Sequence, residues 1–180
     1  YNFYAQTKNG NGDPAAEFGP VSCSTLPAPP AWAVPNHTGN TASSINWDWN
    51  SATGATSYEV FSGGSCGTEL QTIAAPTTDW NESAGLSANT SYTRTLKACN
   101  AGGCSDCSVA AAAYTSANVP INLQGTVVSQ TQINWSWASG GAQKDFQAWN
   151  SADATDWTTD TTWDQSGLTC GRTYDLRVSA

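Results

Sequence analysis

Apolar and polar residues alternate in two short stretches of the chain, residues 44–49 and 132–137. In the first stretch Ile45, Trp47 and Trp49 fall on one face of an extended backbone, and polar side chains fall on the other. The second stretch repeats the pattern 88 positions later with one Ile and two Trp residues. Alternation with a period of two predicts a strand with one buried face, and its recurrence predicts repeated small β domains.

The N-terminal pattern predicts a hairpin. Residues 1–7 and 18–25 read as strands, and the Asn-Gly-Asn-Gly-Asp-Pro sequence between them is rich in turn-forming residues. The Asn and Asp residues of this turn are spaced somewhat as in a calcium-binding loop, but no Glu closes the loop at the usual distance. A hairpin turn is therefore favoured over a calcium site.

The rest of the chain predicts further short strands between turns. Prolines at 27, 29, 30 and 35 mark a linker or an edge strand. Other strands are predicted at 58–61, 77–80, 92–98 and 109–114. These strands, with no long helical pattern between them, predict an all-β chain.

The composition is typical of an extracellular β protein. Hydrophobic residues make up 39% of the 180 positions, charged residues only 11%, and the formal net charge is −8. The six basic residues form no cluster, so nucleic acid is not an expected partner. No apolar run approaches the roughly 20 residues of a membrane helix. The absence of Met and the start at Tyr1 indicate a processed or excerpted piece of a longer product.

Six cysteines in a small β-rich chain favour an oxidising compartment and disulfide bonds. Zinc is the alternative, because Cys99, Cys104 and Cys107 are closely spaced. A structural zinc site usually needs four nearby ligands, and the chain's single histidine, His37, is distant in sequence. Disulfides are therefore the favoured interpretation, and no metal site is expected.

Four motifs in order identify a resemblance. They are Ile-x-Trp at 45–47, Gly-Ala-x-x-Tyr-x-Val at 54–60, Leu-x-x-Asn-Thr-x-Tyr at 86–92 and Ala-x-Asn-x-x-Gly at 98–103. Together they resemble the fibronectin type III domain, in tandem repeats like those of bacterial extracellular proteins. The resemblance covers residues 26–116 as a complete module and 117–180 as a second module without its last strand, strand G. Residues 1–25 resemble strands F and G of another copy.

The resemblance implies a fold class. It is all-β, with tandem fibronectin type III or immunoglobulin-like antiparallel sandwiches of seven strands each, whose incomplete ends are completed by neighbouring chains. It also implies corner tyrosines, Tyr92 and Tyr174, whose hydroxyls bond back to the turn before strand F. The last module departs from the pattern, since Cys-Gly-Arg at 170–172 replaces the Asn-Thr turn.

The family topology suggests cysteine partners. Cys99 and Cys104 flank the tip between strands F and G, where a disulfide would staple it. Cys23 lies late in a strand G and Cys170 precedes a strand F, so these two could bond across a junction between copies. Cys66 and Cys107 fall at opposite ends of their module, and no bond between them is expected.

The open ends suggest assembly. A lone two-stranded hairpin is marginally stable, and a sandwich without strand G has an unpaired edge. Residues 1–25 and 117–180 together count 89 residues, the size of one module. We therefore expect the hairpin of one chain to complete the last module of the next by strand addition, giving an open head-to-tail fibre. The expected assembly residues are Tyr1, Phe3, Ala5 and Val21.

Two points stay open in this expectation. If Tyr1 corresponds to Tyr174, strand F is supplied twice. The alternative is an excerpt of a longer multi-domain protein with trimmed ends.

Other candidate sites are less specific. The chain contains four patterns for asparagine glycosylation, at Asn36, Asn81, Asn89 and Asn134, of which Asn36 is the expected loop site. Most tryptophans are expected in the cores, namely Trp47, Trp49, Trp80, Trp135, Trp137 and Trp163. Trp32 and Trp157 are expected in loops or edges. Phe61 and Trp149 fall on the opposite strand face and are the candidate exposed aromatics, which could contact sugars or a neighbouring subunit.

The sequence predicts no enzymatic activity. A catalytic triad would have to use His37, which is expected in a solvated loop, and the carboxylates of 117–180 are expected to keep the surface soluble. No cofactor is expected, apart from glycans or weakly bound calcium. The predicted function is a structural subunit of an extracellular fibre or cell-surface appendage, whose partners are copies of itself. The alternative is an adhesion, carbohydrate-binding or spacer module of a large secreted or surface protein.

Overall fold

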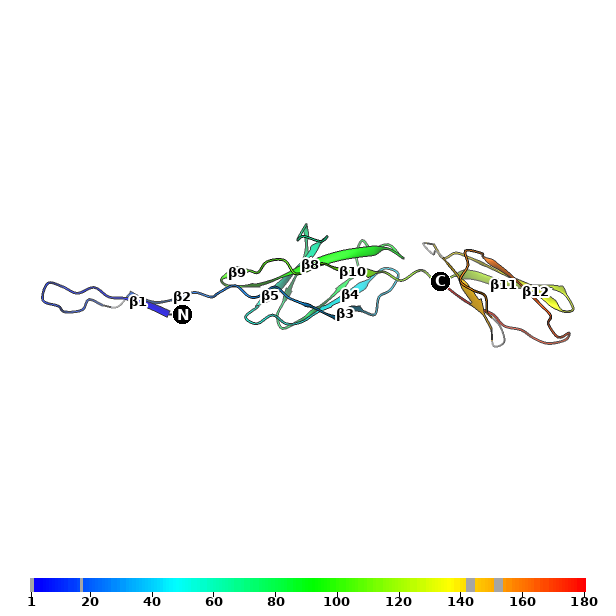
Figure 1. Ribbon diagram of the computed structural model, residues 1–180, viewed down its shortest axis with the longest axis horizontal. Helices are drawn as coiled ribbons and strands as arrows, with labels where there is room; N and C mark the ends of the chain where they lie inside the picture. Colours follow the sequence, from blue (N-terminus) through cyan, green and yellow to red (C-terminus); the bar gives the residue numbers. More distant parts are fainter. Residues whose placement is uncertain (1, 17, 142–144, 151–153) are drawn as a thin grey trace. The chain divides into compact units, whose positions relative to one another are not determined.

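The computed structural model describes residues 2–16, 18–141, 145–150 and 154–180, with the backbone alone for residues 2, 3, 18 and 19. The described residues form strands and no helix, so none of them makes a helix that could cross a membrane. The strands are β1 (Asn2–Ala5), β2 (Phe18–Ser22), β3 (Trp32–Thr38), β4 (Ile45–Trp49), β5 (Ser57–Ser62), β6 (Glu69–Ala74), β7 (Asp79–Glu82), β8 (Ser91–Asn100), β9 (Gly103–Cys104), β10 (Ala111–Tyr114), β11 (Ile121–Ser129), β12 (Gln132–Ala138), β13 (Gln147–Trp149), β14 (Thr162–Ser166) and β15 (Arg177–Ser179) (Figure 1).

The chain divides into two compact units. The first comprises Tyr1–Thr38, Asn46–Trp80 and Tyr92–Ala113. The second comprises Gly39–Ile45, Asn81–Ser91 and Tyr114–Ala180.

The predicted N-terminal hairpin is formed by β1 and β2, which pair antiparallel. Its turn is closed by Asn9, whose Oδ1 accepts hydrogen bonds from the backbone amides of Asn11 and Asp13, each at 2.9 Å. The Asn9 Nδ2 atom donates to the Asp13 carboxylate. These polar groups therefore hold the turn together, as the favoured hairpin interpretation requires.

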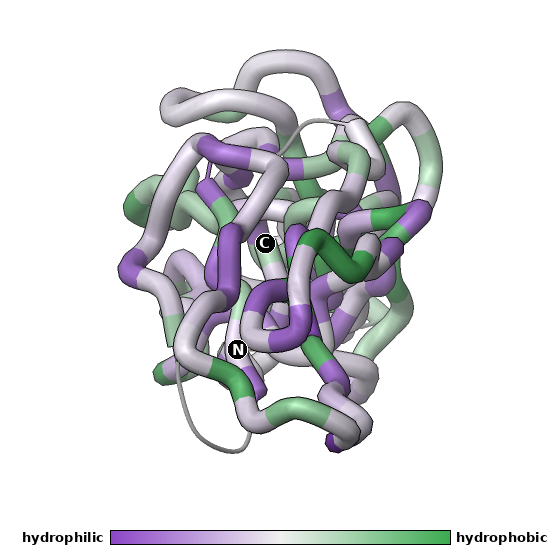
Figure 2. The backbone as a smooth tube through the Cα atoms, turned by 90° about the vertical axis from the view of Figure 1, so that its right-hand side faces the viewer, coloured by the Kyte–Doolittle hydropathy of each residue, from purple (hydrophilic) through white to green (hydrophobic). Residues whose placement is uncertain are grey.

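Two antiparallel sheets form a β-sandwich in the middle of the chain. One has the order β3-β4-β7, and the other has the order β10-β8-β5-β6, with β9 beside β8. The alternation at 45–49 sets the core, because Ile45, Trp47 and Trp49 are at most 3% exposed. Trp49 packs edge-on against Tyr58 of the other sheet, with ring centres 5.6 Å apart. In Figure 2, hydrophobic residues (green) and hydrophilic residues (purple) follow one another at short intervals along the backbone.

The second unit repeats this plan, with fewer strands among its described residues. One sheet has the order β11-β12-β14, and β13 pairs with β15 in a two-stranded sheet. Its core contains the predicted Trp135 and Trp137, together with Phe146, Ala148 and Leu176. Gly125 on β11 lies directly opposite Trp135 on β12, where the absence of a side chain leaves room for the indole ring.

Three other tryptophans lie on strands at the sides of their sheets. Trp80 is half-buried, which corrects the expectation of a core residue, whereas Trp163 is half-buried and packs against the core of the second unit. Trp32 lies on β3, an edge strand as expected, and packs against Trp47 at 5.7 Å between ring centres. Strand β6 was not expected, because its sequence shows no apolar alternation and its residues are mostly exposed.

Candidate functional site

The hairpin presents its described side chains to solvent. Tyr4 is 60% exposed and Val21 is 51% exposed. Of the predicted assembly residues, Tyr1 lies outside the described residues and Phe3 is described only by its backbone, which pairs with Val21. Ala5 pairs with Phe18. The hairpin therefore offers strand edges and apolar side chains for contact with another surface.

The sheet of β13 and β15 has an open edge. By the resemblance, β8 and β15 are equivalent, since each is strand F of its module. In the middle sandwich, β8 lies between β5 and β10. Strand β15 pairs with β13 through Gln147–Ser179, Ala148–Val178 and Trp149–Arg177, and no other described strand lies beside it. Its second edge is therefore unpaired within the described residues.

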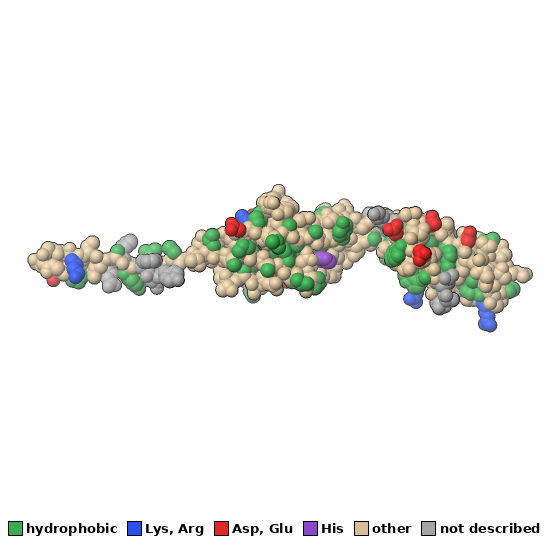
Figure 3. Space-filling view, in the orientation of Figure 1, with side chains coloured by type: hydrophobic (Ala, Val, Ile, Leu, Met, Phe, Trp, Pro, Cys, Tyr) green, Lys and Arg blue, Asp and Glu red, His purple; other side chains and the backbone are tan. Residues whose placement is uncertain are grey.

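Apolar side chains also lie exposed on β11, the edge strand of the other sheet of the second unit. All nine of its residues are exposed, and Val127 reaches 74% and Val128 56%. Few charged side chains appear on the face of the molecule drawn in Figure 3, in keeping with a composition that is only 11% charged. The β11 edge therefore exposes apolar side chains to solvent.

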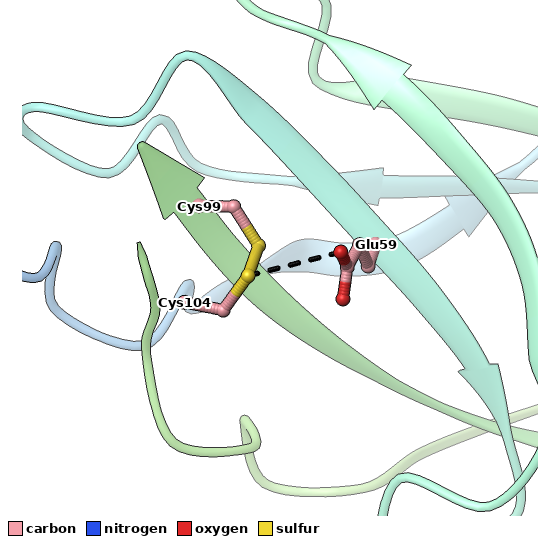
Figure 4. A group of neighbouring side chains, drawn as sticks. All are labelled: Glu59, Cys99 and Cys104. Carbon is pink, nitrogen blue, oxygen red and sulfur yellow. Dashed lines mark hydrogen bonds between the residues drawn. A yellow bond between two sulfur atoms is a disulfide. The ribbon is translucent and has the colours of Figure 1, made fainter. Parts of the chain in front are cut away.

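The hairpin tip that joins β8 to β9 carries the disulfide expected from its sequence. Cys99 and Cys104 are joined with an S–S distance of 2.01 Å, and the Cys104 sulfur lies 3.7 Å from Glu59 Oε1 (Figure 4). Glu59, Cys99 and Cys104 are the one group of three potential metal ligands within the part of the chain that the structure describes. Because both sulfurs are bonded to each other, neither offers the thiolate that a metal needs.

The second disulfide corrects an expectation. Cys66 and Cys107, which were not expected to meet, are joined with an S–S distance of 2.05 Å. The turn after β5 folds back onto β8, where the Cys66 amide donates to Thr95 Oγ1 at 3.1 Å. From the other side, the Ser108 amide donates to the Leu96 carbonyl at 2.8 Å. Both cysteines therefore reach the same part of β8, although strand order alone places them at opposite ends.

Cys23 and Cys170 are exposed and free within the chain. Cys23 lines a cavity of about 390 Å³ whose wall includes Asn100, and Cys170 lines a separate cavity of about 150 Å³. A bond between them in different copies stays a prediction.

The two candidate exposed aromatics differ from expectation. Phe61 is only 9% exposed although it lies on the predicted face, since β5 pairs with β8 in regular register through Phe61 and Thr95. The Lys97 ammonium group lies 5.5 Å from its ring centre. Trp149 is half-buried and lines a cavity of about 230 Å³ with Asn150, Asp175 and Arg177.

Of the corner tyrosines, Tyr92 lies at the start of β8 and Tyr174 precedes β15. The Tyr174 hydroxyl accepts a hydrogen bond from the Thr169 amide at 2.7 Å and donates to the Thr169 carbonyl at 3.3 Å. The Tyr92 ring lies 5.4 Å from the guanidinium carbon of Arg94. Tyr174 thus fixes the turn that precedes the last strand.

The glycosylation candidates are unequally placed. Asn36 is not a loop residue but lies half-buried on β3, and its Nδ2 atom donates to the Ala112 carbonyl at 3.4 Å. Asn134 is half-buried and donates to the Asp164 carboxylate. Asn81 and Asn89 are exposed. The two exposed positions are therefore the more accessible acceptors.

His37 also lies on strand β3 rather than in a solvated loop. It is half-buried and pairs in register with Trp47 of β4. The proline-rich segment takes the edge-strand alternative, with Pro35 at the side of the sheet.

No protein-family model matches the chain. Over 172 residues the chain is 31% identical to chitinase A1 of Niallia circulans, a match that covers 87% of the chain and 24% of that protein. The chain thus spans about a quarter of the length of this curated relative.

Similar solved structures include two from chicken. A two-domain fibronectin type III segment of tenascin is 15% identical, with 86% of this chain and 89% of that chain covered and a TM-score of 0.47. The FN1–FN3 domains of CNTN1 are 18% identical, with 97% and 68% covered and a TM-score of 0.44. In its ordered motifs and its antiparallel β-sandwich, the chain resembles tandem fibronectin type III domains.

Proposed function

We propose that the chain is a structural subunit of an extracellular fibre or appendage, which assembles head to tail by strand complementation. One observation carries the proposal: β8 has a strand on each side, whereas β15 has β13 on one side and no described strand on the other. The exposed hairpin of a second copy supplies the strand that β15 needs.

Strand β2 is the complementing strand in this proposal. It pairs with β1 along one edge, and its other edge pairs with β15 of the neighbouring copy, giving the order β13-β15-β2-β1. This arrangement removes the duplication of strand F, because β1 becomes the outer strand and does not compete with β15. Main-chain hydrogen bonds supply the affinity, and alternate side chains such as Val21 supply the fit.

The proposed extracellular location has support from the covalent structure. Two disulfides, Cys66–Cys107 and Cys99–Cys104, brace one sandwich. Such bonds persist in oxidising compartments. A contact that repeats head to tail without closing gives an open filament, which suits a structural role outside the cell.

The similarity to chitinase A1 favours a second candidate function. The match covers 87% of this chain but only 24% of that protein. A piece of this kind would serve as a spacer or adhesion module within a larger secreted protein that acts on polysaccharide. Such a module stays monomeric, and the adhesion form of this proposal predicts that it sediments with chitin particles.

Sedimentation velocity and negative-stain electron microscopy of the full chain separate the two proposals. The fibre proposal predicts polymers that lengthen with protein concentration. Val21→Asp places a charge on β2 and should abolish them, because unpaired charge blocks edge-to-edge strand pairing. Val109→Asp is the matched control, since Val109 is 78% exposed and lies outside the hairpin. A wild-type chain that stays monomeric at every concentration, or a Val21→Asp chain that polymerises normally, contradicts the fibre proposal.

A further inference from the structure

The residues that follow β10 lie between the turn before β8 and the loop between β3 and β4 of the middle sandwich. Thr115 is 2% exposed, and its Oγ1 atom donates to the Ser87 carbonyl at 2.6 Å and accepts from the Thr90 amide at 3.0 Å. Its own amide donates to the Thr90 carbonyl at 3.1 Å. Thr115 is therefore tied to the turn before β8.

Ser116 extends these ties to the loop between β3 and β4. Its amide donates to the Thr41 carbonyl at 2.9 Å, and its hydroxyl donates to the Asn40 carbonyl at 3.0 Å. Its carbonyl accepts from the Asn89 amide at 3.0 Å. We call the site of Thr115 and Ser116 the filled corner. Two short hydroxyl residues at the end of a strand thus join a loop and a turn.

The matching place at the turn before β15 is a cavity of about 150 Å³, which we call the open corner. Its wall includes Ser129 at the end of β11 and Gln130 from the loop between β11 and β12, as Asn40 and Thr41 belong to the loop between β3 and β4. It also includes Thr169, Gly171 and Arg172 from the turn before β15, and Cys170 within that turn. The open corner has the same kinds of wall as the filled corner but no strand end inside it among the described residues.

We infer that the open corner receives Ser22 and Cys23 of a second copy, an inference that rests on the proposed head-to-tail assembly. Ser22 ends strand β2 and Cys23 follows it, as Thr115 and Ser116 follow strand β10. Both pairs are short-chained and uncharged. Once β2 pairs with β15, Ser22 and Cys23 lie in the corner, while Ser24 and Thr25 stay against Gly102 and Asn100 of their own chain.

This docking brings two exposed thiols to one place. Cys23 is one of the two docking residues, and Cys170 lines the cavity. We propose that they form a disulfide between copies by exchange with a small-molecule disulfide such as oxidised glutathione. Each cysteine loses its proton, one S–S bond forms between the copies, and the two electrons reduce the oxidant to two thiols.

Two adjacent valines of β11 allow a matched test on the full chain. Val127 lines the open corner and Val128 does not, and both are more than half exposed. Val127→Trp should fill the cavity mouth and weaken assembly at least about tenfold, which corresponds to about 1.4 kcal/mol. Val128→Trp should assemble as the wild type does. Equal assembly by the two variants overturns the inference.

A synthetic peptide of residues 18–26 tests the corner without polymerisation. With oxidised glutathione present, it should form a mixed disulfide through Cys23 with Cys170 of the full chain, and Val127→Trp should slow this labelling. If the peptide labels Cys170 but the chain never polymerises, the result supports docking in the open corner and overturns the fibre proposal. If polymers form without a Cys23–Cys170 bond between isotopically distinct copies, and the peptide does not inhibit them, the result overturns docking in the open corner and leaves the fibre proposal intact.

Discussion

Gly125→Ala should destabilise the second unit through a single close contact. A Cβ atom at position 125 would lie 2.6 Å from Cζ3 and 2.8 Å from Cε3 of Trp135. Real Cβ atoms do not approach that closely, so the indole ring must move. The ring is 9% exposed, and its Nε1 atom donates to the buried Gln165 Oε1 at 2.9 Å. Movement of the ring therefore disturbs both core packing and a buried hydrogen bond.

The expected cost follows from these two effects. Overpacking a well-packed core costs about 1–3 kcal/mol, and the weakened indole hydrogen bond adds about 1 kcal/mol. We expect a loss of about 2–4 kcal/mol in the free energy of unfolding. With a urea dependence of about 2 kcal/mol per molar, the midpoint of the transition should fall by about 1–2 M.

Urea unfolding followed by tryptophan fluorescence measures this change. Gly64→Ala is the matched control, because its Cβ would meet only Ala110 Cβ at an ordinary 3.8 Å. The smaller phenyl ring should relieve the clash with the added Cβ. Trp135→Phe should therefore lower the free energy of unfolding less in the Gly125→Ala background than in the wild type. A Gly125→Ala transition within about 0.5 kcal/mol of the wild type would refute the packing argument.

Two further predictions concern the sandwich and its N-terminal segment. Replacing Cys66 and Cys107 by Ala should lower the free energy of unfolding by about 4 kcal/mol, and replacing Cys99 and Cys104 by about 2 kcal/mol, because the bonds close loops with sequence separations of 41 and 5. Thermal unfolding of the two double variants checks this order, and equal losses would contradict it. Gly102→Ala places a Cβ 2.3 Å from the Ser24 carbonyl oxygen and should release residues 23–26, whose Thr25 carbonyl accepts from Asn100 Nδ2 at 2.8 Å. Hydrogen exchange in residues 23–26 should quicken in this variant but not in Gly10→Ala, where a Cβ meets open space, and unchanged protection would oppose the argument.

Local patterns predicted the cores because burial follows the period of the strand. Trp47 and Trp135 each occupy an apolar face at the centre of a sheet, and both are buried. Phe61 lies on the predicted outer face and is buried all the same, because Lys97 lies over its ring and the turn at Cys66 bonds to Thr95, its partner on β8. Alternation therefore predicts the face of a residue but not what covers that face.

Long-range contacts were less accessible to sequence reasoning. The Cys66–Cys107 bond depends on a turn after β5 and a segment after β9 that both approach β8. Neither approach leaves a periodic signal in the sequence. The open corner was also hidden, because its walls come from separate loops that only the fold brings together.

Hydrogen exchange at the backbone amides of β15 is the most direct test of head-to-tail assembly. The full chain is measured at a low and a high protein concentration. Pairing with β2 of a neighbour should slow exchange of residues 177–179 at high concentration, and Val21→Asp should remove this protection. Exchange at these amides that does not change with concentration would contradict strand complementation as the basis of assembly.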